Sequence, residues 1–369
     1  MGKGNGHVRS LGGDRWEVVI GAGRDPVTGK YRNASRRVRG TEAQANRELR
    51  KLIKEVEEGR HHSPRMTVEQ LIADHLARQN GRAHCTVSTQ AAASRRVVAG
   101  LGHIRIDKLT REDVSRFLSA CQERYMIGTV RGYKSILAGA LDSAIERGWL
   151  VENVARGHRL RSGVTKEVVP PTPDQVWKLI SAAQDRDPEF GMFVRLAAAT
   201  GARRGELLGL RRSSLIGDDT LVIVNNVTPG EGGISVGTTK TRQSRRQVTL
   251  DPNTVMALKA HLARQDSLGT ITEADPFIFL GCPQGCHPMP PTTATGSFIA
   301  VRDKLGLTTR LHDLRHFSIT QQLSAGVPVA NVAGRHGNSP TVIHKTYSHF
   351  IPGSDHMAAA VMGNLLPPP

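Results

Sequence analysis

The sequence contains 369 residues, which is more than one ordinary hydrophobic core accommodates, so two or three domains are expected. Hydrophobic residues make up 38% of the chain and aromatic residues only 4%, a balance that favours helices packed on aliphatic side chains over a large β-sandwich. The 50 Lys and Arg residues exceed the 33 acidic residues by 17. Because this excess recurs along the whole chain and attracts polyanions, it indicates a nucleic-acid partner rather than the merely basic surface of an unrelated enzyme.

Membrane and secreted classes are also disfavoured. No apolar run approaches about 18 residues, and the N-terminus lacks the apolar segment of a signal peptide, so a cytosolic protein without a membrane span is expected. The four cysteines are too sparse for a disulfide framework. Cys282 and Cys286 with His287 could form half of a zinc site, but no second half accompanies them, so reduced thiols in a loop are the favoured interpretation.

Residues 1–63 have the pattern of a small β-sheet followed by a helix. DRWEVVIGAG alternates apolar with other residues, DPVTGKYR supplies a turn, and TEAQANRELRKLIKEVEEG is typical of a capped helix. Through Arg65 there are 15 basic and 8 acidic residues, a net charge of +7. Four arginines of the expected sheet could contact DNA or form a solvated face, and the pattern leaves both interpretations open. They are Arg32, Arg36, Arg37 and Arg39.

A short polar linker, HHSPR at 61–65, precedes a helical segment. TVEQLIADHLARQ, LTREDVSRFLSACQERY and VRGYKSILAGALDSAIERGWL each place their apolar residues on one helix face, which is typical of core packing. Thr110 with Asp113 resembles a capping box at the start of the second of these helices.

The prolines of VTKEVVPPTPDQ mark the next boundary. Thr172, Pro173 and Gln175 then carry the start signals of a new helix. Beyond this point the pattern predicts helices interrupted by a small β-region, in which TLVIVNNV and SRRQVTL are short strands, and a further helix from Pro252 to Leu268.

The segment LHDLRHFSIT, residues 311–320, poses a choice between a metal site and a phosphate site. In a helix, His312 and His316 would lie one turn apart, which is the spacing of two metal ligands in zinc hydrolases. Arg315 lies between them in sequence and favours an anion, because a cation is a poor neighbour for a divalent metal and a good one for phosphate.

Three other polar clusters lie in the same part of the chain. In ATGARRGELLGL, Arg203 opens a helix near free backbone amides and Glu206 could orient it, although a surface Arg/Glu pair would look the same. Lys240 follows a Gly-rich turn and is either a general acid on a hairpin or a solvated lysine. In GRHGNSPTVIHKTYSHF, His336 precedes Tyr347, which is either a partly buried amphipathic side chain or a nucleophile.

Taken in order, these clusters resemble the active-site pattern of the tyrosine recombinases, the phage integrase family. TGARRGEL resembles the first arginine box, TKTRQSRR the lysine hairpin, HDLRH the His-x-x-Arg box, and RHGNSPTVIHKTYSH the final histidine and tyrosine. The resemblance implies a multidomain α+β fold. Residues 1–63 would be an arm-type DNA-binding domain with a three-stranded sheet and a helix, 66–158 a helical core-binding (SAM-like) domain, and 170–369 a mainly α catalytic domain with a small β-sheet.

The resemblance also implies catalytic roles. Tyr347 would attack the scissile phosphate and form a 3′-phosphotyrosine, while Arg203 and Arg315 hold the non-bridging oxygens. Lys240 would protonate the departing 5′-oxygen, and His312 would accept the tyrosine proton or hold the phosphate. This chemistry stores the bond energy in the covalent intermediate, so no metal, ATP or other cofactor is implied.

The remaining site residues have lesser implied roles. His336 would add a hydrogen bond to a phosphate oxygen, Glu206 would position the arginines, and His316 would be packed and supporting. The chain departs from the family in that Arg335 stands where Gly is usual, and the cysteines of GCPQGCHPMPP are not part of the family pattern.

The partners implied by the resemblance are double-stranded DNA with core and arm attachment sites, three further copies of the chain in a tetramer, an excisionase and a DNA-bending host factor. The implied location is the bacterial cytoplasm, on the nucleoid. The C-terminal helix around HMAAAVMGNLL could pack within its own chain or on a neighbour.

Three rival classes remain. A type IB topoisomerase would use similar chemistry to relax supercoils, but the N-terminal sheet argues against it. A zinc hydrolase would need a third ligand and a general base near His312 and His316. A DNA-binding regulator that kept the fold without catalysis is disfavoured by the intact set of reacting groups.

Overall fold

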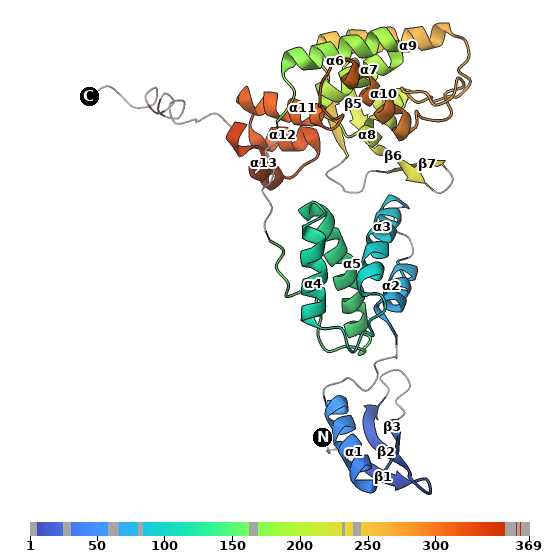
Figure 1. The fold of residues 1–369 in the computed structure, drawn as a ribbon. Coiled ribbons are helices and arrows are strands. Elements are labelled where there is room, and N and C mark those ends of the chain that lie inside the picture. The colour runs from blue at the N-terminus through green and yellow to red at the C-terminus, as the bar shows by residue number, and fades with distance from the viewer. Residues whose placement is uncertain are drawn as a thin grey trace. The chain divides into compact units, whose positions relative to one another are not determined.

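The computed structural model describes residues 6–24, 31–57, 66–79, 84–161, 169–230, 233–238 and 245–350, together with residues 359 and 362. The chain divides into two compact units, Met1–Thr165 and Lys166–Pro369 (Figure 1). Both units combine helices with small antiparallel sheets or hairpins, so the α+β class expected from the sequence is confirmed. Within the described ranges, no helix has both the length and the apolar character needed to cross a membrane.

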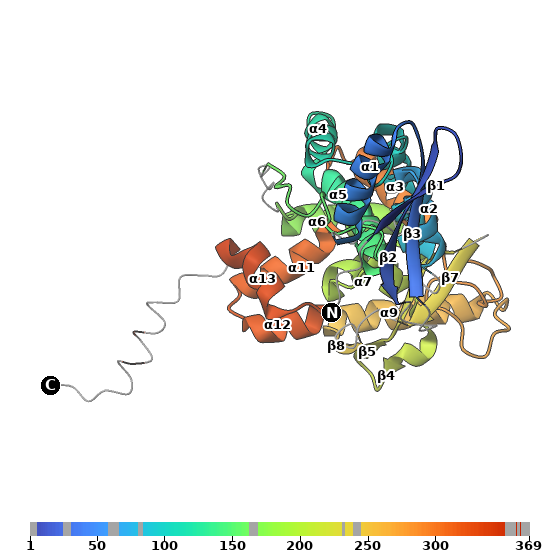
Figure 2. The ribbon, with the colours of Figure 1, turned by 90° about the horizontal axis from the view of Figure 1, so that it is seen from below.

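The first unit begins with a three-stranded sheet and a helix, as expected. β1 (His7–Ser10), β2 (Arg15–Arg24) and β3 (Tyr31–Arg39) are antiparallel, with β2 in the centre. α1 (Glu42–Glu57) lies to one side of the three strands (Figure 2). Alternate residues of β2 meet apolar residues one turn apart on α1, because these two periodicities each place side chains on one face. The buried members of this small core are Val18, Ile20, Ala45, Leu49 and Leu52.

The arginines of β3 point to opposite faces of the sheet, since successive strand residues alternate. Arg36 lies on the helix-covered side and donates to Glu48 at 3.2 Å and to Glu55 at 2.7 Å. Arg37 and Arg39 are exposed. Of these three side chains, Arg37 and Arg39 therefore remain accessible to a partner, while Arg36 ties the sheet to α1.

The described residues in the rest of the first unit form four helices and their connections: α2 (Val68–Ala77), α3 (His84–Leu101), α4 (Arg111–Gln122) and α5 (Ile127–Glu146). Their apolar faces meet in a single cluster, which confirms the predicted stripes. A capping box formed by Thr110 begins α4, also as predicted. The largest fully buried side chains of this cluster are Leu71, Ile72, Leu118, Leu137 and Leu141.

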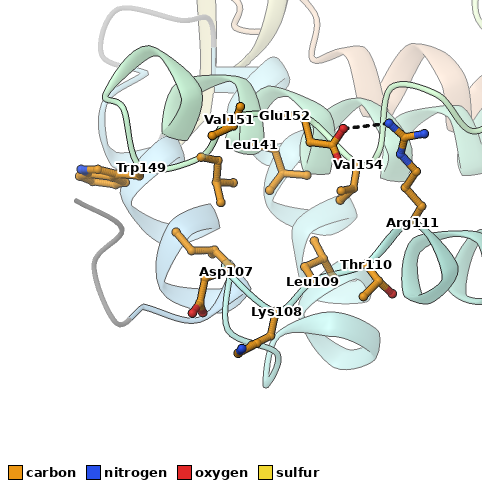
Figure 3. Close-up of a pocket in the computed structure, with 12 residues that line it drawn as sticks. Asp107, Lys108, Leu109, Thr110, Arg111, Leu141, Trp149, Val151, Glu152 and Val154 are labelled. Atoms are coloured by element: carbon orange, nitrogen blue, oxygen red, sulfur yellow. Dashed lines mark hydrogen bonds and ion pairs between the residues drawn. The ribbon is translucent and has the colours of Figure 1, made fainter. Parts of the chain in front are cut away.

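A hollow of about 410 Å³ lies beside these helices (Figure 3). Leu109, Leu141 and Val154 line it, and Arg111 and Glu152 form a 2.8 Å ion pair at its edge. Two acidic and two basic residues line the hollow, so their formal charges cancel. It therefore lacks the concentrated positive charge that an anionic substrate requires.

The second unit is mainly helical. α7 (Pro188–Thr200) packs against α6 (Pro173–Arg186) and α9 (Pro252–Ser267), and α10 (Pro291–Lys304) packs against α6. Thr172 begins α6 as predicted, with a capping box and a proline in the first turn. The largest buried side chains around α7 are Phe190, Phe193, Leu196, Phe279 and Phe298.

A small β-region follows the short helix α8 (Arg204–Leu208). β4 (Leu215–Ile216), β5 (Thr220–Ile223) and β8 (Arg246–Thr249) form one antiparallel sheet. The sequence TLVIVNNV, predicted as one strand, is split between β5 and the following hairpin, because the chain changes partners: β5 pairs with β8, and the next strand pairs with its own successor. That hairpin consists of β6 (Asn225–Gly230) and β7 (Gly233–Thr238).

The described part of the second unit ends with three helices, α11 (Asp313–Ser324), α12 (Val329–His336) and α13 (Pro340–Tyr347), followed by a 3₁₀ turn (Ser348–Phe350). Their apolar side chains form a separate small core that includes Tyr347. The segment HMAAAVMGNLL lies outside the described residues except at 359 and 362, so its expected helix and packing stay predictions.

Candidate active site

Several of the polar residues singled out in the second unit lie at the ends of helices. Gly201 ends α7 with a φ of 59°, and Arg203 immediately precedes α8. His312 precedes α11, and Tyr347 is the last residue of α13. α11 packs against both α7 and α12, and α12 packs against α13. These contacts bring together side chains that are far apart in the sequence.

Arg315 is the most enclosed arginine of the site, with only 4% of its surface exposed. Its Nη1 donates to the carbonyl of Gly201 at 2.7 Å, and its Nη2 donates to the carbonyl of His336 at 2.5 Å and to Oδ1 of Asn338 at 3.0 Å. Burial, followed by the positive charge of Arg203, lowers the pKa of Arg315 to about 10. The guanidinium is therefore charged at neutral pH, and its position is fixed from three sides.

Arg203 is more open and lies beside Arg315. Its Nη1 donates to Glu206 at 2.8 Å, and its Nη2 donates to Asn338 at 3.2 Å. Glu206 is 2% exposed and also accepts from Nη2 of Arg246 at 2.8 Å. Although burial acts in the opposite direction, Arg246 and then Arg203 hold the pKa of Glu206 below its usual value. Glu206 is thus an ionised, buried anchor for two arginines.

Tyr347 is 3% exposed and contacts a histidine of α11. Its hydroxyl lies 2.5 Å from Nδ1 of His316. Burial raises the pKa of Tyr347 to about 12, although the charge of Arg315 acts in the opposite direction. Burial also lowers the pKa of His316, so this ring is neutral at pH 7 and its Nδ1 is able to accept the phenolic proton.

His312 lies next to this pair. Its ring centroid is 5.1 Å from that of His316, with the rings nearly perpendicular. Burial, followed by the charges of His316 and Arg315, lowers the pKa of His312 to about 4. From the sequence we expected His312 to accept the tyrosine proton or hold the phosphate, and His316 to be packed and supporting. In the structure it is His316 that contacts the phenol, and the catalytic roles of both rings stay predictions. Residues one helical turn apart are equivalent in a sequence pattern, and only the packing of α11 distinguishes them.

The ring of His336 faces the interior. It is fully buried, with Nδ1 2.8 Å from the carbonyl of Val332 and Nε2 3.1 Å from the hydroxyl of Ser318. Burial lowers the pKa of His336 to about 3, so the ring is neutral. It lies against Gly201, where an added Cβ would come within 2.5 Å of its Cδ2. The predicted contact of this ring with a phosphate oxygen stays a prediction.

Two residues named from the sequence cannot be placed. Lys240 lies outside the described residues, as does the side chain of Arg32. Conversely, Asn338, Arg246 and Ser318 contact the site but were not anticipated. Asn338 follows the glycine that ends α12 with a φ of 62°, and a short polar residue at a helix end beside the predicted motif was the available signal.

Metal-binding potential is limited in the described part of the chain, which contains no group of three or more His, Cys, Asp or Glu side chains able to hold an ion. The sulfur atoms of Cys282 and Cys286 lie 3.1 Å apart, and the backbone N–H of His287 donates to Cys282. The sequence GCPQGCH therefore forms a compact loop whose role is unassigned.

Two arginines that converge on one oxygen, with Arg315 close enough to Tyr347 to act on its pKa, are groups suited to a phosphate ester and a nucleophilic phenol. Residues 171–351 match the model of the phage integrase family. The chain belongs to this family, the tyrosine recombinases.

Relatives and solved structures extend the likeness beyond this segment. The integrase of Mycobacterium phage L5 is 24% identical over 278 residues, which cover 74% of this chain and 72% of that protein. The integrase of Streptomyces ambofaciens is 25% identical over 351 residues, or 89% and 87% of the two chains.

The fold is shared with integrases bound to DNA. A Tn1549 transposon integrase in complex with a circular intermediate DNA has a TM-score of 0.70 at 21% identity and covers 82% of this chain and 100% of that chain. A lambda integrase tetramer bound to a Holliday junction has a TM-score of 0.58 at 16% identity and covers 94% and 97%.

Proposed function

We propose that this protein is a site-specific DNA recombinase that integrates, and in the reverse reaction excises, a phage or mobile element. It cuts and rejoins DNA through a 3′-phosphotyrosine and a four-way junction. The observation that carries the proposal is the convergence of Arg203 and Arg315 on one oxygen, next to the Tyr347–His316 pair. Family membership and the DNA-bound relatives support the same reaction.

The nucleophile in this proposal is the phenolic oxygen of Tyr347. It forms a bond to phosphorus as the bond from phosphorus to the 5′-oxygen breaks. With a pKa of about 12 the phenol is almost entirely protonated at pH 7, so attack requires a base. His316 already contacts the hydroxyl and accepts this proton, and His312, whose ring lies against it, holds the phosphate or relays the proton.

The two arginines stabilise the charge that builds on the non-bridging oxygens. Arg315 is held by protein contacts before DNA arrives, so little reorganisation is needed in the transition state. Arg203 is held by Glu206 and is more exposed, as a group that meets DNA must be. Lys240 protonates the departing 5′-oxygen, a role that rests on its match to the family motif. Neither metal nor ATP enters the scheme.

Three parts of the chain divide the work on DNA: 1–63 binds arm sites, 66–158 binds core sites, and 170–369 performs catalysis. The exposed side chains of Arg37 and Arg39 are the arm contacts best supported by their position, whereas Arg36 is committed to α1. Four protomers act on two core sites in the bacterial cytoplasm, with an excisionase and a DNA-bending host factor setting the direction.

Covalent capture tests this proposal. The full chain is incubated with nicked duplexes tiled across the DNA that flanks its gene, so that cleavage releases a short fragment and traps the protein on DNA. We expect one SDS-stable adduct, which is lost in Tyr347→Phe while DNA binding persists. Tyr125→Phe is the matched control because it removes a hydroxyl in the first unit. An adduct formed at full yield by Tyr347→Phe would refute the assignment of Tyr347 as the nucleophile.

Recombination between two plasmids, each carrying the captured duplex, separates a recombinase from an enzyme that only relaxes DNA. We expect joint molecules together with four-way junction intermediates. Relaxation of supercoils without any joint product would point instead to a topoisomerase.

A further inference from the structure

Asn338 is a side chain of the site to which the sequence assigned no role. Nη2 of Arg203 lies 3.2 Å and Nη2 of Arg315 3.0 Å from the same atom, Oδ1 of Asn338. An oxygen that accepts from two guanidinium groups stands in the same relation to them as a non-bridging phosphate oxygen does. Asn338 therefore lies at the point where the phosphate-binding groups converge.

The ring of His336 does not reach this point. Both of its nitrogens are used inside the protein, by the carbonyl of Val332 and the hydroxyl of Ser318. A neutral imidazole has one N–H and one acceptor nitrogen, so neither function is left for a ligand. Toward the arginines His336 presents only its backbone carbonyl, 2.5 Å from Nη2 of Arg315.

We propose that Asn338, in place of the His336 ring, is the third group that contacts the phosphate of DNA; this rests on the proposed function above. Before DNA binds, its Oδ1 holds the two guanidinium groups at one point and offsets their mutual repulsion. When a phosphate oxygen takes that place, the arginine donors pass to the phosphate and Nδ2 of Asn338 donates a hydrogen bond to it. Its half-buried position leaves it accessible to DNA, unlike the His336 ring.

The test compares rates of covalent adduct formation by the full chain, at saturating protein, on the nicked duplex that the unmodified protein cleaves. Asn338→Ala should lower the rate by about 10²-fold, the usual effect of losing one donor to a developing oxyanion. Its DNA affinity should stay close to that of Asn331→Ala, the matched control, which removes the same side chain from an exposed position on α12. Its melting temperature should fall somewhat below that of the control, because the two guanidinium groups lose their shared acceptor.

Asn338→Asp separates a contact with phosphate from a purely structural role. A carboxylate of the same shape pairs with both arginines and competes with the phosphate for them. The melting temperature should therefore be maintained or raised, while the adduct rate falls at least as far as in Asn338→Ala. A stable Asn338→Asp that reacts at the unmodified rate would overturn the inference.

Asn338→His supplies a third readout. The amide does not titrate, whereas an imidazole does, with an unperturbed pKa near 6.5 that the neighbouring Arg203 and Arg315 lower. We expect this variant to recover part of the rate lost in Asn338→Ala and to gain, below about pH 6.5, a pH-dependent step in addition to the one that Asn338→Ala shares with the unmodified protein. An Asn338→Ala rate equal to that of Asn331→Ala refutes this inference alone; failure of the unmodified protein to form any adduct refutes the proposed function as well.

Discussion

The position of Gly201 excludes alanine for two reasons. Its φ of 59° lies in the left-handed region, and a Cβ built on it would lie 2.5 Å from Cδ2 and 2.6 Å from Nε2 of His336. The imidazole is fully buried and hydrogen-bonded on both nitrogens, so it has little room to move. Gly201→Ala should therefore displace His336 and, with it, the two carbonyl groups that hold Arg315.

Gly217→Ala separates the two costs. Gly217 has the same φ of 59°, but a Cβ there would meet nothing within 4 Å. The left-handed conformation costs an alanine about 1–2 kcal/mol, and this should be the whole effect at Gly217. At Gly201 the alanine methyl group would also overpack the buried space beside His336, which should lower the free energy of unfolding by about a further 2 kcal/mol. For a unit of this size, that extra destabilisation corresponds to roughly 4–8 °C in melting temperature.

Differential scanning calorimetry of the full chain measures both variants, and covalent capture measures their activity. Gly201→Ala should melt below Gly217→Ala and form adduct more slowly, since Arg315 is anchored through the Gly201 carbonyl. Equal melting temperatures of the two variants would show that the His336 ring can move away from the added methyl group without lowering stability. Normal adduct formation by a destabilised Gly201→Ala would refute the link between this glycine and the arginine.

Three further predictions concern protons and charge. Stability should fall as pH drops from about 6.5 toward 4, by up to about 1.4 kcal/mol per pH unit for each of His312 and His336. In this pH range the two histidines bind protons in the unfolded chain but stay neutral in the folded protein, because burial lowers their pKa. A denaturation midpoint that stays constant over this range would contradict the conclusion that both rings are buried and neutral. His316→Phe should slow adduct formation by about 10²-fold or more at neutral pH, and an unchanged rate would move proton transfer to His312. Arg37→Ala should weaken binding to arm DNA and reduce the salt slope by about one, whereas Arg36→Ala should mainly lower the stability of the N-terminal sheet; equal effects on binding in a gel-shift salt titration would refute this division.

Elements specified by neighbouring residues were predictable from the sequence. The capping boxes begun by Thr110 and Thr172 form between residues three positions apart, and the structure has both. The apolar stripe on α5 is likewise a local pattern whose members are buried as expected. The division of TLVIVNNV between two strands was missed, because which strand pairs with which depends on distant segments.

It was harder to predict to which face of a strand or helix a side chain points where residues of the same type occupy both candidate positions. Arginines occupy both faces of β3, so alternation alone did not reveal that Arg36 turns to the glutamates of α1 while Arg37 remains exposed. His312 and His316 are similarly interchangeable on one face of α11. In each case the contact is made with another element, and the pattern of a single element does not contain that information.

By itself the sequence determined the chemical inventory of this protein: a strong positive charge, two arginines, histidines and a tyrosine in the order of a known family. The tertiary structure decided how these groups are used. It placed Asn338 between arginines 135 and 23 positions away and turned the ring of His336 inward. The order of the motifs can be read along the sequence. A hydrogen bond, however, requires a distance of about 3 Å between two atoms, and here the packing of the helices sets that distance.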